Sequence, residues 1–367
     1  MRLSVLDFPP PPARLVGQPR VAGLESGPRS IAAVRVLRIS ITDRCNYRCL
    51  YCMPEEGVRW LPNSDILSLS EIADVARAAV EVHGITRFKL TGGEPTVRPG
   101  LVDLVAELTA IPGVEDLSMT TNGQLLAGMA AELRHAGLQR ITVSIDSLRP
   151  ERFRRITRTG NLAAVLRGLD RAEDVGFTSL KVNCVTMRGV NDDELADFAR
   201  LTLSRRLTVR FIEYMPLGES ALLDSAGPAA GCSGQNRGTD SLVPEGEVRS
   251  AIERELGPLS PVRRDSEAGV GPATVWRLAE APGRIGFISA MSEPFCATCN
   301  RLRLTADGLL RSCLFEGGEV DIKPILRSAL LTQNRRAMLA EAMTDCVRLK
   351  PDVHSYHGNQ QMSRIGG

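Results

Sequence analysis

Three cysteines near the amino end of the chain have the spacing of an iron–sulfur ligand set. Cys45, Cys49 and Cys52 form a Cys-x3-Cys-x2-Cys motif directly after a run of strand-forming residues. Three thiolates on one loop can hold three irons of a 4Fe–4S cluster and leave the fourth iron open. The alternative is zinc, which commonly takes four ligands in two separated pairs, yet the first histidine of the chain is His83. The pattern therefore favours a cluster with an open iron over a zinc site.

A second group of three cysteines lies near the carboxyl end. Cys296 and Cys299 are separated by two residues, and Cys313 follows after thirteen more. The chain has nine cysteines, and an odd number with six in two tight groups indicates metal or redox chemistry in a reducing compartment. Cys346 is a candidate fourth ligand, which would make the second group a structural cluster. The alternative is a second cluster with an open iron.

Composition excludes several classes of protein. The chain has 367 residues, of which 43% are hydrophobic and 24% charged, enough for one large α/β domain and a smaller one. A net charge of +2 gives no basic field of the kind that nucleic-acid binding needs. No apolar run has the length of a membrane helix, and residues 1–30 have four consecutive prolines but no apolar signal core. We expect a cytoplasmic enzyme without a nucleic-acid or membrane partner, and a disordered extension at residues 1–30.

Short β-branched runs alternate with helical stretches about six times. Strands are expected at residues 34–42, 87–91, 116–120, 140–146, 179–185 and 207–214, and helices at 70–83, 100–109, 124–135, 162–174 and 191–203. This alternation predicts right-handed βαβ units and a parallel sheet that closes in part into a barrel. In such folds chemistry gathers at the carboxyl ends of the strands. The cysteine loop falls there, as do residues 91–95, 120–123, 144–147 and 213–216.

These motifs together resemble the GTP 3′,8-cyclase family of molybdenum cofactor biosynthesis (the MoaA family), within the radical S-adenosylmethionine (SAM) superfamily. The resemblance covers roughly residues 34–367. It rests on residues 42–54 (TDRCNYRCLYCMP), 90–95 (LTGGEP), 120–123 (TTNG), 210–216 (RFIEYMP), 296–308 (CATCNRLRLTADG) and the terminal Gly366-Gly367. The first motif alone would indicate only the superfamily. The second triplet followed by Asn-Arg-Leu-Arg, together with the diglycine end, is more selective.

The resemblance implies a fold and a reaction. The fold would be an α/β, incomplete (β/α)6 TIM-like barrel of the radical SAM type with a C-terminal iron–sulfur-binding extension. Two 4Fe–4S clusters and SAM would be the cofactors and GTP the substrate. GTP would become (8S)-3′,8-cyclo-7,8-dihydro-GTP as SAM is cleaved to 5′-deoxyadenosine and methionine, the first step of molybdopterin biosynthesis. The implied partners are a cyclic pyranopterin monophosphate synthase downstream and a reductase or a flavodoxin- or ferredoxin-type electron donor.

The resemblance also assigns site residues. The metal ligands would be Cys45, Cys49, Cys52, Cys296, Cys299 and Cys313. The SAM site would include Tyr51, Gly93, Glu94, Ser144 and Met215. The GTP site would include Arg38, Lys89, Thr120, Lys181, Arg210, Arg301, Leu302 and Arg303, and the open iron of the second cluster would bind the guanine. Gly366 and Gly367 would enter the active site, where only glycine is slim enough to approach closely.

One position departs from the family pattern. Lys89 stands where we expect arginine. Lysine keeps the charge but loses the planar fork that pairs with phosphate.

For the chain as a whole, we expect an extension at 1–30, a barrel at 31–240 with a flexible loop at 217–239, and a C-terminal region at 241–367. Cys184 is expected to pack as a small apolar group, and Cys232 in the loop is interpreted as a bystander. The chain is expected to be a monomer or a homodimer.

Two other functions remain open from the sequence. The first is a radical SAM enzyme that modifies a peptide and uses the second cluster as an auxiliary. Such enzymes often carry more C-terminal cysteines, whereas this chain has one triplet and an Arg-x-Arg suited to phosphate. The second is a non-catalytic iron–sulfur or zinc protein used for sensing or scaffolding. The Gly-Gly-Glu motif and Ser144 at strand ends argue against it, and SAM binding would separate the two classes.

Overall fold

A computed structural model describes residues 27–217, 241–263, 271–315, 318–354 and 365. The predictions for residues 1–26, for Cys232 and nearly all of the 217–239 loop, and for the terminal diglycine lie outside these residues. The predicted boundary at 240/241 stays a prediction. Among the described helices, none is both long enough and apolar enough to cross a bilayer.

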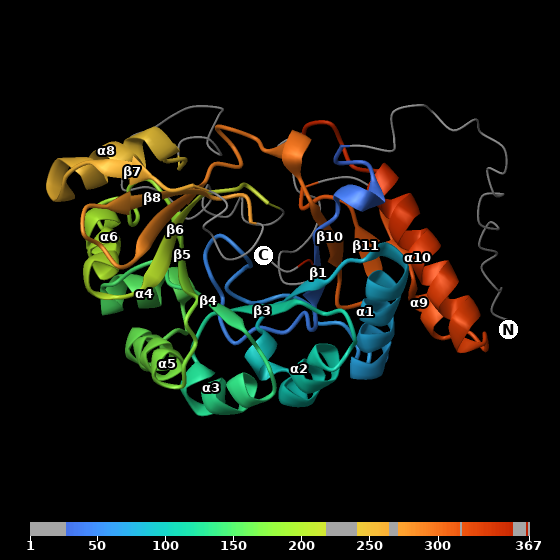
Figure 1. The fold of residues 1–367 in the computed structure, drawn as a ribbon. Coiled ribbons are helices and arrows are strands. Elements are labelled where there is room, and N and C mark those ends of the chain that lie inside the picture. The colour runs from blue at the N-terminus through green and yellow to red at the C-terminus, as the bar shows by residue number, and fades with distance from the viewer. Residues whose placement is uncertain (1–26, 218–240, 264–270, 316–317, 355–364, 366–367) are drawn as a thin grey trace, which may run out of the picture.

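Six parallel strands form the centre of the sheet. They are β1 (Val36–Ser40), β2 (Arg87–Thr91), β3 (Asp116–Thr121), β4 (Arg140–Ser144), β5 (Leu180–Thr186) and β6 (Leu207–Glu213), paired in sequence order. The helices of this half are α1 (Leu69–His83), α2 (Leu101–Thr109), α3 (Leu126–His135), α4 (Pro150–Thr157), α5 (Leu162–Asp174) and α6 (Leu195–Ser204). Figure 1 shows the strands as an arc with these helices along its outer side. The predicted βα alternation is confirmed, with α4 as an additional helix.

The remainder of the chain extends both sides of the same sheet. On the β1 side lie β10 (Arg301–Leu304), β11 (Leu309–Arg311) and β12 (Glu319–Asp321), and on the β6 side lie β9 (Arg284–Ile288), β8 (Thr274–Leu278) and β7 (Leu259–Pro261). In the described chain β12 and β7 are the two ends of the strand order. The barrel is therefore incomplete, as predicted. The later helices are α8 (Glu245–Leu256), α9 (Lys323–Leu326) and α10 (Thr332–Arg348).

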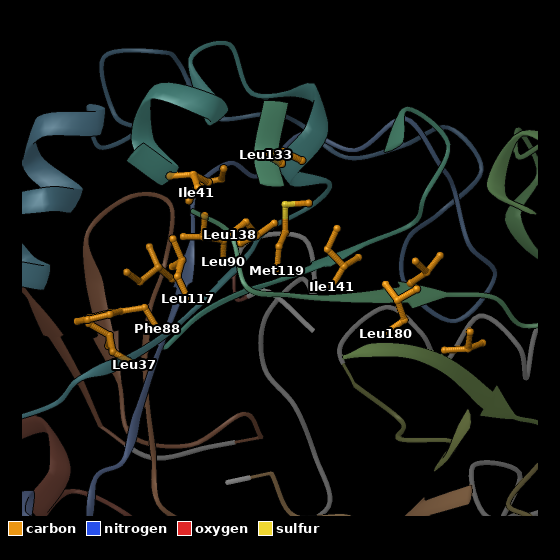
Figure 2. Close-up of a cluster of buried hydrophobic side chains, with 14 of the residues drawn as sticks. Leu37, Ile41, Phe88, Leu90, Leu117, Met119, Leu133, Leu138, Ile141 and Leu180 are labelled. Carbon is orange, nitrogen blue, oxygen red and sulfur yellow. The ribbon is translucent and has the colours of Figure 1, made fainter. Parts of the chain in front are cut away.

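Strand alternation separates the core from the barrel interior. Leu37, Phe88 and Leu117 are register partners and are fully or almost fully buried. They belong to the apolar layer in Figure 2, which also contains Leu133 of α3. Because successive side chains of a strand point to opposite faces, the intervening residues face the inside of the arc. Hydrophobic packing on one face thus fixes which side chains enter the interior on the other.

The start of α1 shows how a local signal sets an element. Sequence alone placed the helix start at residue 70, but the N-cap is Ser68. Its hydroxyl accepts a hydrogen bond from the Glu71 backbone at 3.2 Å, and the Glu71 carboxylate accepts one from the Ser68 backbone at 2.7 Å. This reciprocal capping box satisfies two backbone donors that the helix leaves unpaired. The helix therefore begins at Leu69.

Candidate active site

One cavity of about 380 Å³ lies inside the barrel and gathers most of the predicted site residues. Its wall includes all six triplet cysteines, the five predicted SAM residues, and Arg38, Lys89, Thr120, Lys181, Arg210, Arg301 and Arg303. Leu302 is the exception, because its side chain is fully buried in the hydrophobic core. Strand alternation turns it away from Arg301 and Arg303, so only its backbone is left to serve a ligand. The five SAM residues are Tyr51, Gly93, Glu94, Ser144 and Met215.

The first cysteine loop is fastened to the end of α4. The backbone amides of Arg48 and Leu50 donate to the carbonyls of Thr157 and Ile156 at 3.1 and 2.9 Å. The guanidinium of Arg158 donates to the carbonyls of Arg48 and Met53, both at 3.0 Å. The short helix that sequence analysis missed therefore holds the cysteine loop in place. A proline at its first turn and Glu151 after it were the available signals.

Side chains between the three cysteines reach the ends of two strands, β3 and β4. The hydrogen bonds are Asn122 Nδ2 to Asn46 Oδ1 at 2.7 Å, Tyr47 Oη to Gln124 Oε1 at 2.7 Å, and Tyr51 Oη to Asp146 Oδ2 at 2.7 Å. Asn122 and Gln124 follow β3, and Asp146 follows β4. The loop is thus held from several sides while its cysteines face the cavity.

Burial dominates the acid–base behaviour of these cysteines. It raises the pKa of Cys45 to about 11 and that of Cys52 to about 12, and it holds the pKa of Cys49 well above its usual value. Desolvation disfavours the thiolate, which is the metal-binding form. A bound cationic group would reverse this preference and release the protons.

The Gly-Gly-Glu motif packs directly on the backbone that leads into the cysteine loop. A Cβ atom on Gly92 would lie 2.5 Å from the Thr42 carbonyl oxygen, and one on Gly93 would clash with the Arg44 carbonyl. The amides of Gly93 and Glu94 donate to those two carbonyls, each at 2.8 Å. Glycine is therefore required here for a close approach of two backbones, and this approach places Gly93 on the cavity wall.

Glu94 has a structural task that the sequence did not reveal. Its Oε1 accepts hydrogen bonds from the Thr96 amide, the Thr96 hydroxyl and the Thr121 hydroxyl, and its Oε2 accepts one from the Asn122 amide. Burial raises its pKa while these hydrogen bonds lower it. Oε1 thus accepts three hydrogen bonds and Oε2 only one, so Oε2 is the oxygen with room for a further donor. Its predicted contact with SAM stays a prediction.

The ends of β4 and β5 are joined by Asp146. Its Oδ1 accepts from the Val185 amide at 2.9 Å, while Oδ2 accepts from Tyr51. Burial raises the pKa of this carboxyl to about 6, although the two hydrogen bonds act to lower it. Ser144 and Met215 line the cavity beside it. Cys184 is a buried residue of β5, and the side-chain amide of Asn191 contacts its sulfur at 3.7 Å. This burial is consistent with the small apolar packing expected for Cys184.

The cavity wall carries more positive than negative side chains. The cations of the described wall are Arg38, Lys89, Arg140, Lys181, Arg210, Arg301 and Arg303, and the carboxylates are Glu94, Asp116, Asp146 and Glu213. Burial and the neighbouring cations lower the pKa of Lys89 well below its usual value, and burial lowers that of Arg303 to about 10. Like charges held together in this way favour an anionic ligand. A polyphosphate would relieve the repulsion.

Arg140 and Asp116 are cavity residues that sequence analysis missed. They begin β4 and β3 and form an ion pair, with Arg140 Nε 2.7 Å from an Asp116 oxygen. They were overlooked because the rule that places chemistry at the carboxyl ends of strands directs attention away from strand starts. Their alternation with Thr142 and Ser118 was the available signal.

The second triplet is held by elements far apart in the sequence. Buried Glu213 at the end of β6 accepts hydrogen bonds from the amides of Met291 and Ser292 at 2.8 and 2.9 Å, just before the triplet begins. After α10, the Lys350 ammonium donates to the Cys299 carbonyl at 3.1 Å. Cys346 does not line the described cavity wall. Its thiol is buried and faces the Gly318 carbonyl at 3.8 Å.

The donor sets fit iron–sulfur clusters in composition and placement. No three His, Cys, Asp or Glu side chains in the described part of the chain lie close enough to hold a single metal ion. Each triplet instead offers three thiols on one cavity wall. Cys45 and Cys49 pack against the hydrophobic core on one side and line the cavity on the other.

Comparisons with known proteins agree with this geometry. The radical SAM superfamily matches residues 39–202, and the Molybdenum Cofactor Synthesis C family matches residues 207–356. A GTP 3′,8-cyclase of Pelotomaculum thermopropionicum is 48% identical over 91% of this chain and 98% of the relative. One from Moorella thermoacetica is 46% identical over the same shares, and one from Pseudomonas putida is 43% identical over 90% and 93%.

A solved structure supports the fold. Streptococcus suis SuiB bound to S-adenosylmethionine matches 90% of this chain and 77% of its own length with a TM-score of 0.54, at 11% identity. At that identity the likeness concerns the fold alone. Membership of the radical SAM superfamily implies a 4Fe–4S cluster and SAM, which agrees with the first triplet on the cavity wall. By these sequence matches, the chain belongs to the GTP 3′,8-cyclase family of radical SAM proteins.

Proposed function

We propose that the chain converts GTP to (8S)-3′,8-cyclo-7,8-dihydro-GTP, with SAM cleaved to 5′-deoxyadenosine and methionine, in molybdopterin biosynthesis. The observation that carries the proposal is a single cavity whose wall holds two cysteine triplets and an excess of cations. One triplet suits a radical SAM cluster, and the cations suit a nucleoside triphosphate. The relatives named above supply the particular reaction.

The end of the cavity that carries the first triplet would bind SAM. When bound there, a 4Fe–4S cluster supplies the electron for reductive cleavage of SAM, and the resulting radical chemistry joins C3′ of the ribose to C8 of the guanine. The chain's own residues would position SAM and the substrate and exclude water from them. Gly93 offers its backbone, Glu94 keeps one acceptor position on Oε2 for an amino group, and Ser144 and Met215 face the cavity.

The cationic wall would hold the triphosphate. Arg38, Lys89 and Arg303 lie on neighbouring strands as register partners, so their side chains enter the cavity at one level. Guanidinium groups bind phosphate through paired hydrogen bonds, whereas lysine acts as a point charge. Thr120, Lys181, Arg210 and Arg301 would complete the site.

The second triplet would hold a 4Fe–4S cluster that binds the guanine through its open iron. This would orient C8 toward the ribose and make the ring closure an intramolecular reaction in a fixed geometry. Cys346 faces Gly318 rather than the cavity, which supports three ligands rather than four. Gly366 and Gly367 would enter the same cavity, and Ile365 before them is buried.

The remaining partners follow from the chemistry. A flavodoxin- or ferredoxin-type protein or a reductase would supply the electron, and a cyclic pyranopterin monophosphate synthase would take the product. Cysteine thiols stay reduced, and so able to bind iron, in a reducing compartment, so we propose a cytoplasmic location.

An anaerobic assay of the iron-reconstituted protein tests the function. The protein is incubated with SAM, a strong reductant and each nucleoside triphosphate in turn, and mass spectrometry follows 5′-deoxyadenosine and the nucleotide. The expected result is 5′-deoxyadenosine and a cyclised isomer with GTP alone. Cleavage of SAM in every sample with unchanged GTP would point to a different substrate, such as a peptide. No cleavage with both clusters assembled would favour a non-catalytic protein.

A further inference from the structure

Lys350 is a buried cation beside the second triplet. It follows α10 directly and is only 4% exposed. Its ammonium donates a hydrogen bond to the Cys299 carbonyl at 3.1 Å. Among the described residues, that carbonyl is its partner, and no carboxylate forms an ion pair with it. Within the described residues, the charge is therefore held inside the protein without a neutralising side chain.

Two other cations of the described chain have such a partner. The almost completely buried Arg311 is paired with Glu319, and Arg140 in the cavity wall is paired with Asp116. A buried charge without an opposite charge is strongly unfavourable. The contrast with these two arginines indicates that Lys350 is matched by a negative charge that the side chains of the described residues do not supply.

The second triplet can supply that charge. Cys299 is the residue whose backbone Lys350 contacts. Burial and, more weakly, Arg301 lower the pKa of Lys350, whereas Cys299, Cys346 and Cys313 raise it. Thiolates bound to iron remain anionic, and the charge near a cluster helps to set its reduction potential. A fixed cation stabilises the reduced cluster more than the oxidised one, because reduction adds one electron.

Lys350 is also fixed in place on both sides. Arg29 donates to the Lys350 carbonyl at 2.9 Å and forms an ion pair with Asp352 at 2.7 Å. Further on, the His354 ring lies 3.0 Å from the Ala290 carbonyl and stacks on Phe315 with ring centroids 4.0 Å apart. The ammonium is therefore held in one position rather than free to move into solvent.

We propose that Lys350 is the counter-charge of the second iron–sulfur cluster and raises the reduction potential of that cluster. The inference rests on the proposed second cluster and names a tuning residue for it. Lys350 is not part of the described cavity wall, so its role is electrostatic and positional rather than catalytic.

Replacement of the charge tests the proposal. We compare full-length wild type, Lys350→Met and Lys350→Arg after anaerobic reconstitution, by iron content and by a potentiometric titration followed by electron paramagnetic resonance. A parallel set with Cys45, Cys49 and Cys52 replaced by serine isolates the second cluster. Lys323→Met is the matched control, because it removes a lysine of α9 that lies off the cavity wall.

The expected result is a more negative potential of the second cluster in Lys350→Met. At a fixed applied potential its reduced-to-oxidised ratio should fall about tenfold, which is about 59 mV for a one-electron couple. Lys350→Arg and Lys323→Met should titrate as wild type. Loss of the second cluster in Lys350→Met with retention in Lys350→Arg would also support the charge.

Three outcomes overturn the proposal. An unchanged potential in Lys350→Met, with both clusters present, rejects the electrostatic role and leaves the second cluster intact. Equal loss of the second cluster in Lys350→Met and Lys350→Arg assigns the residue to loop structure. A wild type that binds iron for one cluster only rejects the second cluster and the counter-charge together.

Discussion

The two cysteine triplets share one cavity but differ in what surrounds them. The first is held by hydrogen bonds from the ends of β3 and β4, and buried carboxylates lie near it: Glu94 raises the pKa of Cys45, and Asp146 raises that of Cys49, in each case after the larger effect of burial. The second is held by the C-terminal segment, and its neighbours Lys350 and Arg303 are cations.

This difference in charge suits two different tasks. A cluster that must give an electron to a sulfonium group needs a low potential, and nearby carboxylates disfavour the additional negative charge of reduction. A cluster that binds a purine as a Lewis acid has no such need, and nearby cations stabilise its thiolates. We therefore infer that the surroundings, more than the ligands, separate the two sites.

The largest expected effect divides the two triplets by function. Cys49→Ser should abolish formation of 5′-deoxyadenosine, because the first cluster loses a ligand and SAM loses its electron source. Cys299→Ser should leave cleavage of SAM measurable while the cyclised nucleotide falls at least about a hundredfold, since orientation is worth several kcal/mol. Both products are quantified by liquid chromatography and mass spectrometry under anaerobic conditions.

Cys184→Ala is the control for loss of a thiol. Cys184 is a buried residue of β5 and belongs to neither triplet, so the iron content of the Cys184→Ala variant should equal that of wild type. If Cys299→Ser abolishes cleavage of SAM while the first cluster remains assembled, the division of tasks is wrong.

The next effect concerns the cationic wall that the second triplet shares with the nucleotide. Arg303→Ala should weaken GTP binding by about thirtyfold, or about 2 kcal/mol, because a hydrogen bond between charged groups contributes that much. SAM affinity should change little. Isothermal titration calorimetry with each ligand measures both quantities on the reconstituted protein.

Arg87→Ala provides the matched control. Arg87 starts β2 but is not part of the described cavity wall; it pairs with Glu115 at 2.9 Å, and a third of its side chain is exposed. The Arg87→Ala variant should bind GTP with the affinity of wild type. Equal losses in the two variants would assign the effect to net charge rather than to the cavity.

The central barrel could be predicted because its signals are local. Alternation along β1 and β2 buries Leu37 and Phe88 in the core and turns Arg38 and Lys89 to the cavity. The first cysteine motif spans only eight residues, so its thiols had to share one loop. In each case spacing along the chain decides spacing in the structure.

The surroundings of the second triplet could not be predicted in this way. Lys350 meets Cys299 across 51 residues, and Arg29 meets Lys350 across 321, contacts that depend on how α10 packs beside the sheet. The short helix α4 was also missed, since eight residues carry too little periodicity to identify a helix. Leu302 stays a prediction: the motif range included it, and strand alternation turns its side chain into the core, so only its backbone is left to serve a ligand.

A smaller effect tests how the first loop is braced. Tyr51→Phe removes the 2.7 Å hydrogen bond to the buried Asp146 carboxylate, and Tyr47→Phe removes one of equal length to the Gln124 amide. Hydrogen bonds to charged groups contribute more than neutral ones, so the free energy of unfolding of the apoprotein should fall by about 2 kcal/mol and about 1 kcal/mol, respectively. Urea denaturation measures both, and equal losses would show that the charge on Asp146 adds nothing to the brace.

The smallest effect concerns the charge of Lys89. Burial, followed by Arg210 and Arg38, lowers its pKa well below the usual lysine value, so its ammonium loses its proton at a lower pH than a free lysine does. GTP affinity should therefore fall several-fold as the pH rises through this lowered pKa, since a neutral amine attracts phosphate weakly.

Between this lowered pKa and the ordinary lysine pKa, the unfolded apoprotein binds more protons than the folded one. The free energy of unfolding therefore rises with pH over that range. Lys89→Arg keeps its charge throughout and should show a flatter GTP affinity profile between neutral and alkaline pH, measured by calorimetry. Identical profiles for the two proteins would place Lys89 away from the phosphates and leave the arginines of β1 and β10 to hold them.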